Sequence, residues 1–175
     1  MKKITICYML LIAVTALDAQ GFIKGKTYLG PTIGYGLGFG YGAGVEHAIF
    51  DKIGIGAEIA MQSFEESGNF RFGNYNYEWK WKYNLFGALL AATYHFNKGK
   101  EFDPFVRVGI GYFNYNAEYT DNEGSSLKYN NASYTSGLGY TGQLGFRYHI
   151  SESSSLRATV GYPFYVAGGI DFTLN

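Results

Sequence analysis

Apolar and polar residues alternate with a period of two along most of the chain after residue 20. The clearest stretch places on one face Ile53, Ile55, Ala57, Ile59 and Met61, and on the other face Gly54, Gly56, Glu58, Ala60 and Gln62. Successive side chains of a β-strand point to opposite faces, so this pattern is typical of strands. The sequence shows no convincing 3.6-residue stripe of an amphipathic helix. The chain is therefore predicted to be all-β.

Eight such segments follow one another, and each has the roughly 9 to 11 residues with which a tilted strand crosses a bilayer. They cover residues 27–38, 40–50, 53–72, 75–96, 104–120, 132–150, 155–163 and 165–175. Short polar turns, predicted to be periplasmic, lie at residues 51–52, 97–103 and 151–154. The remaining connections, predicted to be extracellular, lie near Gly38, Gly73, Glu123 and Pro163.

The composition indicates which face of these strands is inside. The 175 residues include 25 glycines, which share a face with charged residues, while the other face carries large apolar side chains. In a soluble, lipocalin-like barrel, which is the alternative, glycine would be scattered over the solvent surface. A membrane barrel instead turns its apolar face to lipid and encloses small and polar side chains. We therefore predict an eight-stranded antiparallel up-and-down transmembrane β-barrel.

The first residues have the pattern of a secretory signal. Two lysines precede an apolar run over residues 4–17, and small residues lie at or just after its end, at Ala16 and Ala19. We expect cleavage after Ala19, with Ala16 as the alternative, which gives a signal peptide over 1–19 and a barrel domain over 20–175. The only cysteine, Cys7, lies in the signal, so the mature chain has no cysteine ligand or disulfide.

The charge of the mature chain does not favour nucleic acid as a partner. Removing Lys2, Lys3 and Asp18 leaves 12 basic and 13 acidic residues of the original 14 of each. A protein that binds nucleic acid through its phosphates needs a basic excess, which is missing here.

These features resemble the small eight-stranded outer-membrane barrels of the OmpA/OmpX type, and more closely the glycine-rich outer membrane protein β-barrel domain of Gram-negative bacteria. The resemblance covers residues 21–175 and rests on the signal, the eight alternating segments and the closing segment 168–175. It implies location in the outer membrane, contact with its lipid and lipopolysaccharide, and insertion by the barrel-assembly machinery. It also implies a structural or adhesive role, with a surface or host protein as partner, and we expect a monomer.

Six charged residues fall on the face predicted to line the barrel. They are Glu46, Glu58, Asp171, Arg107, Arg147 and Arg157. An isolated charge is costly in a narrow interior, so we predict a salt-bridged plug whose hydrogen bonds are completed by Gln62, Gln143, Thr141, Thr159 and His149. The alternative is a gate, which would make the protein a small pore for ions or small solutes.

Aromatic residues continue beyond the length of a bilayer in the third and fourth segments. They are Phe70, Phe72, Tyr75, Tyr77, Trp79 and Trp81. This pattern predicts a hairpin that projects outward, near a tip at Gly73. The resemblance to OmpX-like barrels implies that such a protruding sheet offers an interaction surface to a partner, and β-strand addition is a physically reasonable mode of binding. The alternative is that Trp79 and Trp81, with Tyr83 and Tyr112, form the outer aromatic girdle at the lipid surface.

Signals for catalysis are weak. His149 and Ser151 share a face, which resembles the His-x-Ser pair of lipid A deacylase barrels, but the acid expected about a dozen residues later is missing. The spacing of the three histidines does not suggest a metal site. We expect no enzyme and no cofactor, and keep a lipid A-modifying activity as a remote alternative.

Overall fold

The computed structural model describes residues 21–97, 101–129 and 136–174 of the chain. The strands are β1 (Thr27–Tyr35), β2 (Phe39–Phe50), β3 (Ile53–Phe72), β4 (Tyr75–His95), β5 (Phe102–Asp121), β6 (Ser126–Tyr129), β7 (Gly137–Ser151), β8 (Ser154–Tyr162) and β9 (Val166–Leu174). The predicted signal peptide, residues 1–19, lies outside the described residues.

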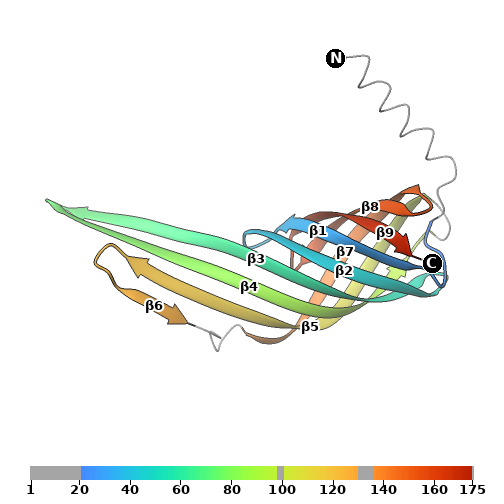
Figure 1. Ribbon diagram of the computed structural model, residues 1–175, viewed down its shortest axis with the longest axis horizontal. Helices are drawn as coiled ribbons and strands as arrows, with labels where there is room; N and C mark the ends of the chain where they lie inside the picture. Colours follow the sequence, from blue (N-terminus) through green and yellow to red (C-terminus); the bar gives the residue numbers. More distant parts are fainter. Residues whose placement is uncertain (1–20, 98–100, 130–135, 175) are drawn as a thin grey trace, which may run out of the picture.

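Eight of these strands close into a ring. Each pairs antiparallel with its neighbours in the order β1, β2, β3, β4, β5, β7, β8, β9, and β9 pairs with β1 to complete the barrel. The ninth strand, β6, lies outside the ring, and within the described part of the chain it pairs with β5 alone (Figure 1). The predicted fold, an all-β antiparallel transmembrane barrel, is confirmed.

Three strands extend well beyond the barrel at the end opposite the short turns (Figure 1). Strand β2 pairs with β3 only as far as Ser63, whereas β3 and β4 stay paired up to Phe72 and Tyr75. Strand β5 follows β4 as far as Asp121 and carries β6 on its other side. We call this extension, residues 64–72, 75–83 and 114–121 with β6, the external sheet.

The described boundaries differ from the predicted ones in several places, and β1 ends at Tyr35 and not at residue 38. Strand β5 begins at Phe102, so Asp103 belongs to a strand and not to the predicted turn 97–103. Strand β6 falls within the stretch 120–131, which we expected to be a loop. The start of the sixth predicted segment, 132–135, lies outside the described residues, and β7 begins at Gly137.

Alternation gives the barrel two unlike faces. The outward face is large, apolar and exposed, as at Ile110, Leu138 and Leu144, and lipid covers it in a membrane barrel. The inward face carries most of the glycines and most of the buried polar side chains, as at Glu58 and Arg147. Among the described residues, no helix has the length and apolar character needed to span a membrane.

Candidate functional site

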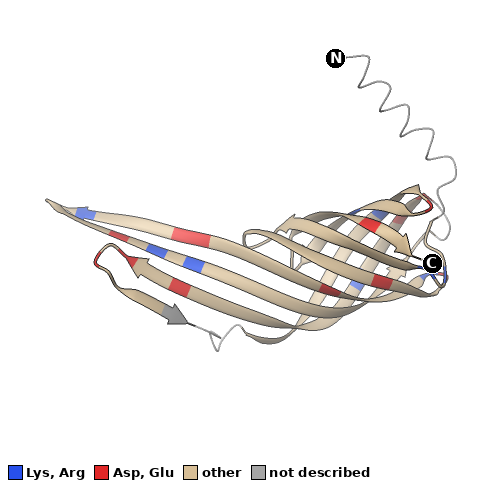
Figure 2. Ribbon diagram, in the orientation of Figure 1, with Lys and Arg blue, Asp and Glu red and all other residues tan. Residues whose placement is uncertain are grey.

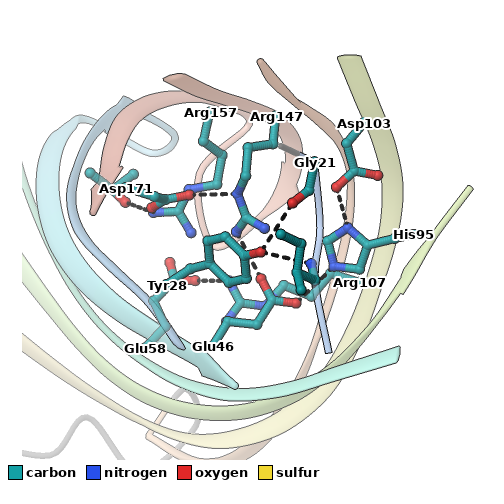
Figure 3. A network of polar contacts seen from close by, with 12 residues as sticks. Gly21, Tyr28, Glu46, Glu58, His95, Asp103, Arg107, Arg147, Arg157 and Asp171 are labelled. Carbon is teal, nitrogen blue, oxygen red and sulfur yellow. Dashed lines mark hydrogen bonds and ion pairs between the residues drawn. The ribbon is translucent and has the colours of Figure 1, made fainter. Parts of the chain in front are cut away.

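The centre of the lumen is occupied by ion pairs around Arg147 (Figure 3). Arg147 donates from Nη2 to Glu46 Oε2 at 2.8 Å and from Nε to Asp171 Oδ2 at 2.9 Å. Its guanidinium carbon lies 4.5 Å from the ring centroid of Tyr28, so a cation–π contact adds to the two ion pairs. Arg147 is only 1% exposed, and its charge is balanced entirely inside the barrel.

The other two predicted arginines extend this cluster across the lumen. Arg157 Nη2 lies 3.3 Å from Asp171 Oδ1 and donates to Thr32 Oγ1 at 2.7 Å. Arg107 donates from Nη1 to Glu58 Oε2 at 2.7 Å. The structure therefore brings all six sequence-predicted charged residues inside the barrel and pairs each one with an opposite charge.

Two buried residues that the sequence analysis did not include complete the cluster. His95, on β4, lies with Nδ1 2.6 Å from Asp103 Oδ2 and with Nε2 3.0 Å from Glu46 Oε1. Both ring nitrogens thus face a carboxylate oxygen, and each can donate a hydrogen bond when the ring is protonated. With Tyr28 on β1 and His95 on β4, every strand of the ring contributes a side chain to this network (Figure 3).

An aromatic side chain closes the short-turn end of the lumen. Phe22 precedes β1 and is fully buried, with its ring stacked 3.6 Å from the His95 ring centroid. The Tyr28 hydroxyl accepts a hydrogen bond from the Ile23 amide at 2.9 Å, and the Gly25 amide donates to the Ala48 carbonyl. The segment before β1 is therefore folded into the barrel mouth.

A second aromatic side chain closes the opposite end. Phe164, between β8 and β9, is 1% exposed and packs on Ala60 and Ala167. A larger residue at Gly34 on β1 or at Gly40 on β2 would clash with the Phe164 ring, because a Cβ there would lie 2.8 Å or 2.6 Å from it. Glycine at these two positions makes room for the ring.

Gln62 ties together the two loops at this end. Its Nε2 donates to the Pro163 carbonyl at 2.7 Å, and its Oε1 accepts from the Leu37 amide at 3.0 Å. Gln143 and Thr141, which were also expected to complete the interior, donate to the Tyr162 carbonyl.

The other two residues expected to complete the interior make fewer contacts. Thr159 and His149 face the lumen, and His149 contacts Tyr28 edge-on, but His149 Nε2 has no hydrogen-bond partner among the described residues.

All six residues of the predicted interaction surface share one face of the external sheet. The register pairs Phe72 with Tyr75 and Phe70 with Tyr77, and it continues through Trp79 and Trp81 towards the barrel. The tip is open, since Phe70 and Phe72 are 62% and 76% exposed. We call this side of the external sheet the aromatic face.

Ring contacts and hydrogen bonds order the aromatic face nearer the barrel. Trp81 packs on Tyr119, with ring centroids 5.0 Å apart, and Tyr77 shares a hydrogen bond with the Tyr119 hydroxyl. That hydrogen bond raises the pKa of Tyr77 well above its ordinary value, so the phenol stays neutral. At the tip, a hydrogen bond to Glu123 likewise raises the pKa of Tyr75.

The girdle interpretation is wrong for the two tryptophans. Trp79 and Trp81 have the same parity along β4 as Leu85 and Leu89, which are buried in the lumen, so their face continues the inside of the barrel and not its lipid surface. Tyr112 does face outward and is 48% exposed. The aromatic face therefore continues the inner face of the barrel and does not face lipid.

The remaining chemical candidates do not assemble. His149 is buried in the lumen, whereas the Ser151 hydroxyl lies at the short-turn end and bonds Ser154 Oγ at 2.8 Å. Within the described residues, no group of three His, Cys, Asp or Glu side chains converges as metal ligands would.

Solved structures with a similar fold are outer-membrane barrels. The N-terminal β-barrel domain of Pseudomonas aeruginosa OprF matches with a TM-score of 0.54 and 15% identity, over 86% of this chain and 98% of that one. Ail, the attachment invasion locus protein of Yersinia pestis, matches in its complex with the heparin analogue sucrose octasulfate with a TM-score of 0.52 and 12% identity, over 87% of this chain and 100% of that one.

At these identities the likeness shows the fold alone. No curated protein matches the sequence. The model of the outer membrane protein beta-barrel domain matches residues 7–173, which is nearly the whole chain. The protein therefore belongs to the outer membrane protein β-barrel domain family and is an integral protein of the outer membrane.

Proposed function

We propose that this protein is a closed outer-membrane barrel that acts as an adhesin, making contacts with partners through its external sheet. The short-turn end faces the periplasm in this proposal, and the external sheet projects from the cell. The observation that carries it is the extension of β3 and β4 beyond the barrel, with six aromatic residues gathered on one face.

The filled lumen supports a scaffold and disfavours the small pore. An eight-stranded barrel has an interior just wide enough for its own side chains. Here that space holds the ion pairs around Arg147, and the rings of Phe22 and Phe164 occupy its two ends. A solute would have to displace both rings and separate paired charges to pass.

The exposed tip supports a role in binding. Solvent-exposed phenylalanines are costly, and contiguous apolar patches on a surface mark sites of interaction. Phe70 and Phe72 have no structural role in the barrel, because they lie at the far end of the hairpin from it. Ail, which has a similar fold, is named as an attachment protein, and this agrees with an adhesive role here.

The test is to shorten the hairpin without touching the barrel. Residues 64–83 are replaced by an Asn-Gly turn that joins Ser63 to Asn84, which already pair across β3 and β4. Cells that display the full or the shortened chain at equal density are then compared for adhesion to host cells, to abiotic surfaces and to one another. We expect the shortened chain to fold and to lose adhesion, and equal adhesion by the two would overturn the proposal.

A further inference from the structure

One edge of the external sheet is unpaired. Strand β3 pairs with β4 along its whole length, but its other edge meets β2 only as far as Ser63. Within the part of the chain that the structure describes, no strand covers that edge over residues 64–72. Figure 1 shows this part of β3 running uncovered beyond β2. Alternate residues of the nine therefore present unpaired backbone N–H and C=O groups at the edge.

This edge lacks two of the features that usually prevent edge-to-edge pairing, proline and bulges, and its three charged residues, Glu65, Glu66 and Arg71, are of both signs. Residues 64–72 contain no proline and no lysine, and their pairing with β4 runs without a register shift. Natural proteins protect exposed edges with prolines, charged residues or bulges, and a long regular edge is a template for another strand. The external sheet is thus built to accept a strand at β3.

The sequence of the edge is complementary to itself. When a second copy is aligned antiparallel with Gly68 opposite Gly68, Glu65 lies opposite Arg71 of the second copy, and Phe64 lies opposite its Phe72. The two-fold symmetry repeats both pairs, which gives two ion pairs and two aromatic pairs. Among the described residues Arg71 has no acidic partner, whereas Glu65 already pairs with Lys80 Nζ at 2.6 Å. The proposed pairing gives Arg71 an acidic partner and places a second basic group beside Glu65. Figure 2 shows charges of both signs along the part of β3 that extends beyond the barrel.

Other antiparallel alignments of the two β3 edges bring fewer complementary side chains together. A shift by one residue would place the aromatic face of one copy beside the polar face of the other, because side chains alternate along a strand. Shifts that keep the faces aligned, centred on Ser67 or Asn69, place no opposite charge of the second copy across from Glu65 or Arg71. Only the register centred on Gly68 satisfies the charges and keeps the aromatic faces continuous.

Antiparallel pairing also fixes how the two barrels lie. Strand β3 runs outward from its own barrel, so the antiparallel β3 of a second copy runs back towards that barrel (Figure 1). The two barrels then lie at opposite ends of the joined sheet, and they sit in two facing membranes. Nine paired residues span roughly 30 Å, which sets how closely the membranes must approach.

We infer that the partner of the external sheet is a second copy of this chain in an opposing membrane, joined antiparallel through residues 64–72 of β3. The inference rests on the proposed adhesive function and names its partner. The glycine at the centre is consistent with it: Gly68 lies under the Trp79 ring, and a Cβ there would lie 2.6 Å from that ring. The centre of the edge is therefore flat, and no side chain on it obstructs the approach of another strand.

The test uses charge reversal on the full mature chain, refolded into phosphatidylcholine vesicles that carry one of two lipid dyes. Vesicles with the wild-type chain should aggregate. Glu65→Arg places Arg opposite Arg, and Arg71→Glu places Glu opposite Glu, so each variant alone should aggregate at least fivefold more slowly. A mixture of the two variants restores both ion pairs, and two-colour aggregates should return to the wild-type rate.

Glu66→Arg is the matched control. It changes the net charge as Glu65→Arg does, but residue 66 lies opposite Phe70 in the proposed register, so wild-type aggregation should persist. The inference is overturned if wild-type vesicles stay dispersed, if the two variants do not rescue each other, or if Glu66→Arg is equally slow. If wild-type vesicles stay dispersed but adhesion of cells to another surface still depends on the hairpin, only the identity of the partner is refuted. If adhesion survives shortening of the hairpin, the proposed function is refuted as well.

Discussion

Replacement of Arg107 by methionine tests the lumen network most sharply. Arg107 and Glu58 are 4% and 6% exposed, and the 2.7 Å pair between them is the only ion pair that either makes among the described residues. Methionine removes the charge but keeps much of the volume, so Glu58 is left buried without a partner. Removing one partner of a buried ion pair costs about 3 to 5 kcal/mol.

The double variant Arg107→Met/Glu58→Leu provides the matched comparison. Replacement of both charges by apolar groups removes the unpaired carboxylate, and such replacements are often close to neutral. We therefore expect the double variant to be more stable than Arg107→Met alone, although it carries one more substitution. Arg147→Met is a poorer probe, because Glu46 keeps His95 and Asp171 keeps Arg157 as partners.

The assay is urea unfolding of the refolded mature chain in detergent micelles. Both tryptophans lie in the external sheet, so far-ultraviolet circular dichroism is used to follow the barrel in place of fluorescence. A free energy of unfolding for Arg107→Met within about 0.5 kcal/mol of wild type, which is the usual range for surface substitutions, would refute the role of the pair. A double variant less stable than Arg107→Met would refute the electrostatic reason for it.

Three further predictions follow from single contacts. Phe22→Ala removes a ring stacked on His95 and should lower the free energy of unfolding by about 3 kcal/mol, measured by the same urea titration; an unchanged midpoint would show that the segment before β1 is not docked. Gly68→Val should displace the Trp79 ring towards water and shift tryptophan emission to longer wavelength, and unchanged emission would contradict the close contact between them. The hydrogen bond from Lys80 lowers the pKa of Glu65. The proposed ion pair between Glu65 and Arg71 of a second copy needs the ionised carboxylate, so it is present above that pKa and is lost as the pH falls through it. Vesicle aggregation should therefore persist at pH 5 and disappear only at lower pH, and loss already at pH 6 in light-scattering measurements would exclude Glu65 as the titrating group.

Side-chain parity explains why much of the lumen could be predicted from the sequence. In a strand of regular alternation one residue of known orientation fixes all the others, so Glu58 and Arg107 could be placed inside. Which acid meets which arginine depends on the stagger between strands that are distant in sequence. Glu46 and Arg147 are 101 residues apart, and no local pattern relates them.

Three residues of the lumen were missed in the sequence, and for two of them side-chain parity offered a signal. Asp103 was placed in the turn before the predicted segment 104–120, although it shares the parity of Arg107 in β5, and that signal could have found it. His95 could have been found from the parity of Leu85 and Leu89 in β4. Phe22 carries no such signal, because it lies outside the regular strands, where alternation gives no orientation.

The tryptophans show the limit of arguing from composition. Tryptophan is enriched at membrane interfaces, and this suggested a girdle, but the orientation of Trp79 and Trp81 follows from the strand they occupy. Once β4 is known to turn Leu85 and Leu89 into the lumen, both rings must lie on the inner face of the extension. Parity is therefore a stronger guide than residue preference in a continuous strand.

Ion conductance shows whether the barrel is closed and whether its activity lies outside the membrane. The refolded mature chain is inserted into a planar bilayer, alongside the Arg107→Ala and Arg147→Ala variants. A lumen filled by ion pairs and closed by Phe22 and Phe164 predicts no conductance steps from the wild-type chain. Steady wild-type steps that change with either arginine substitution would contradict a closed barrel and place the function inside it.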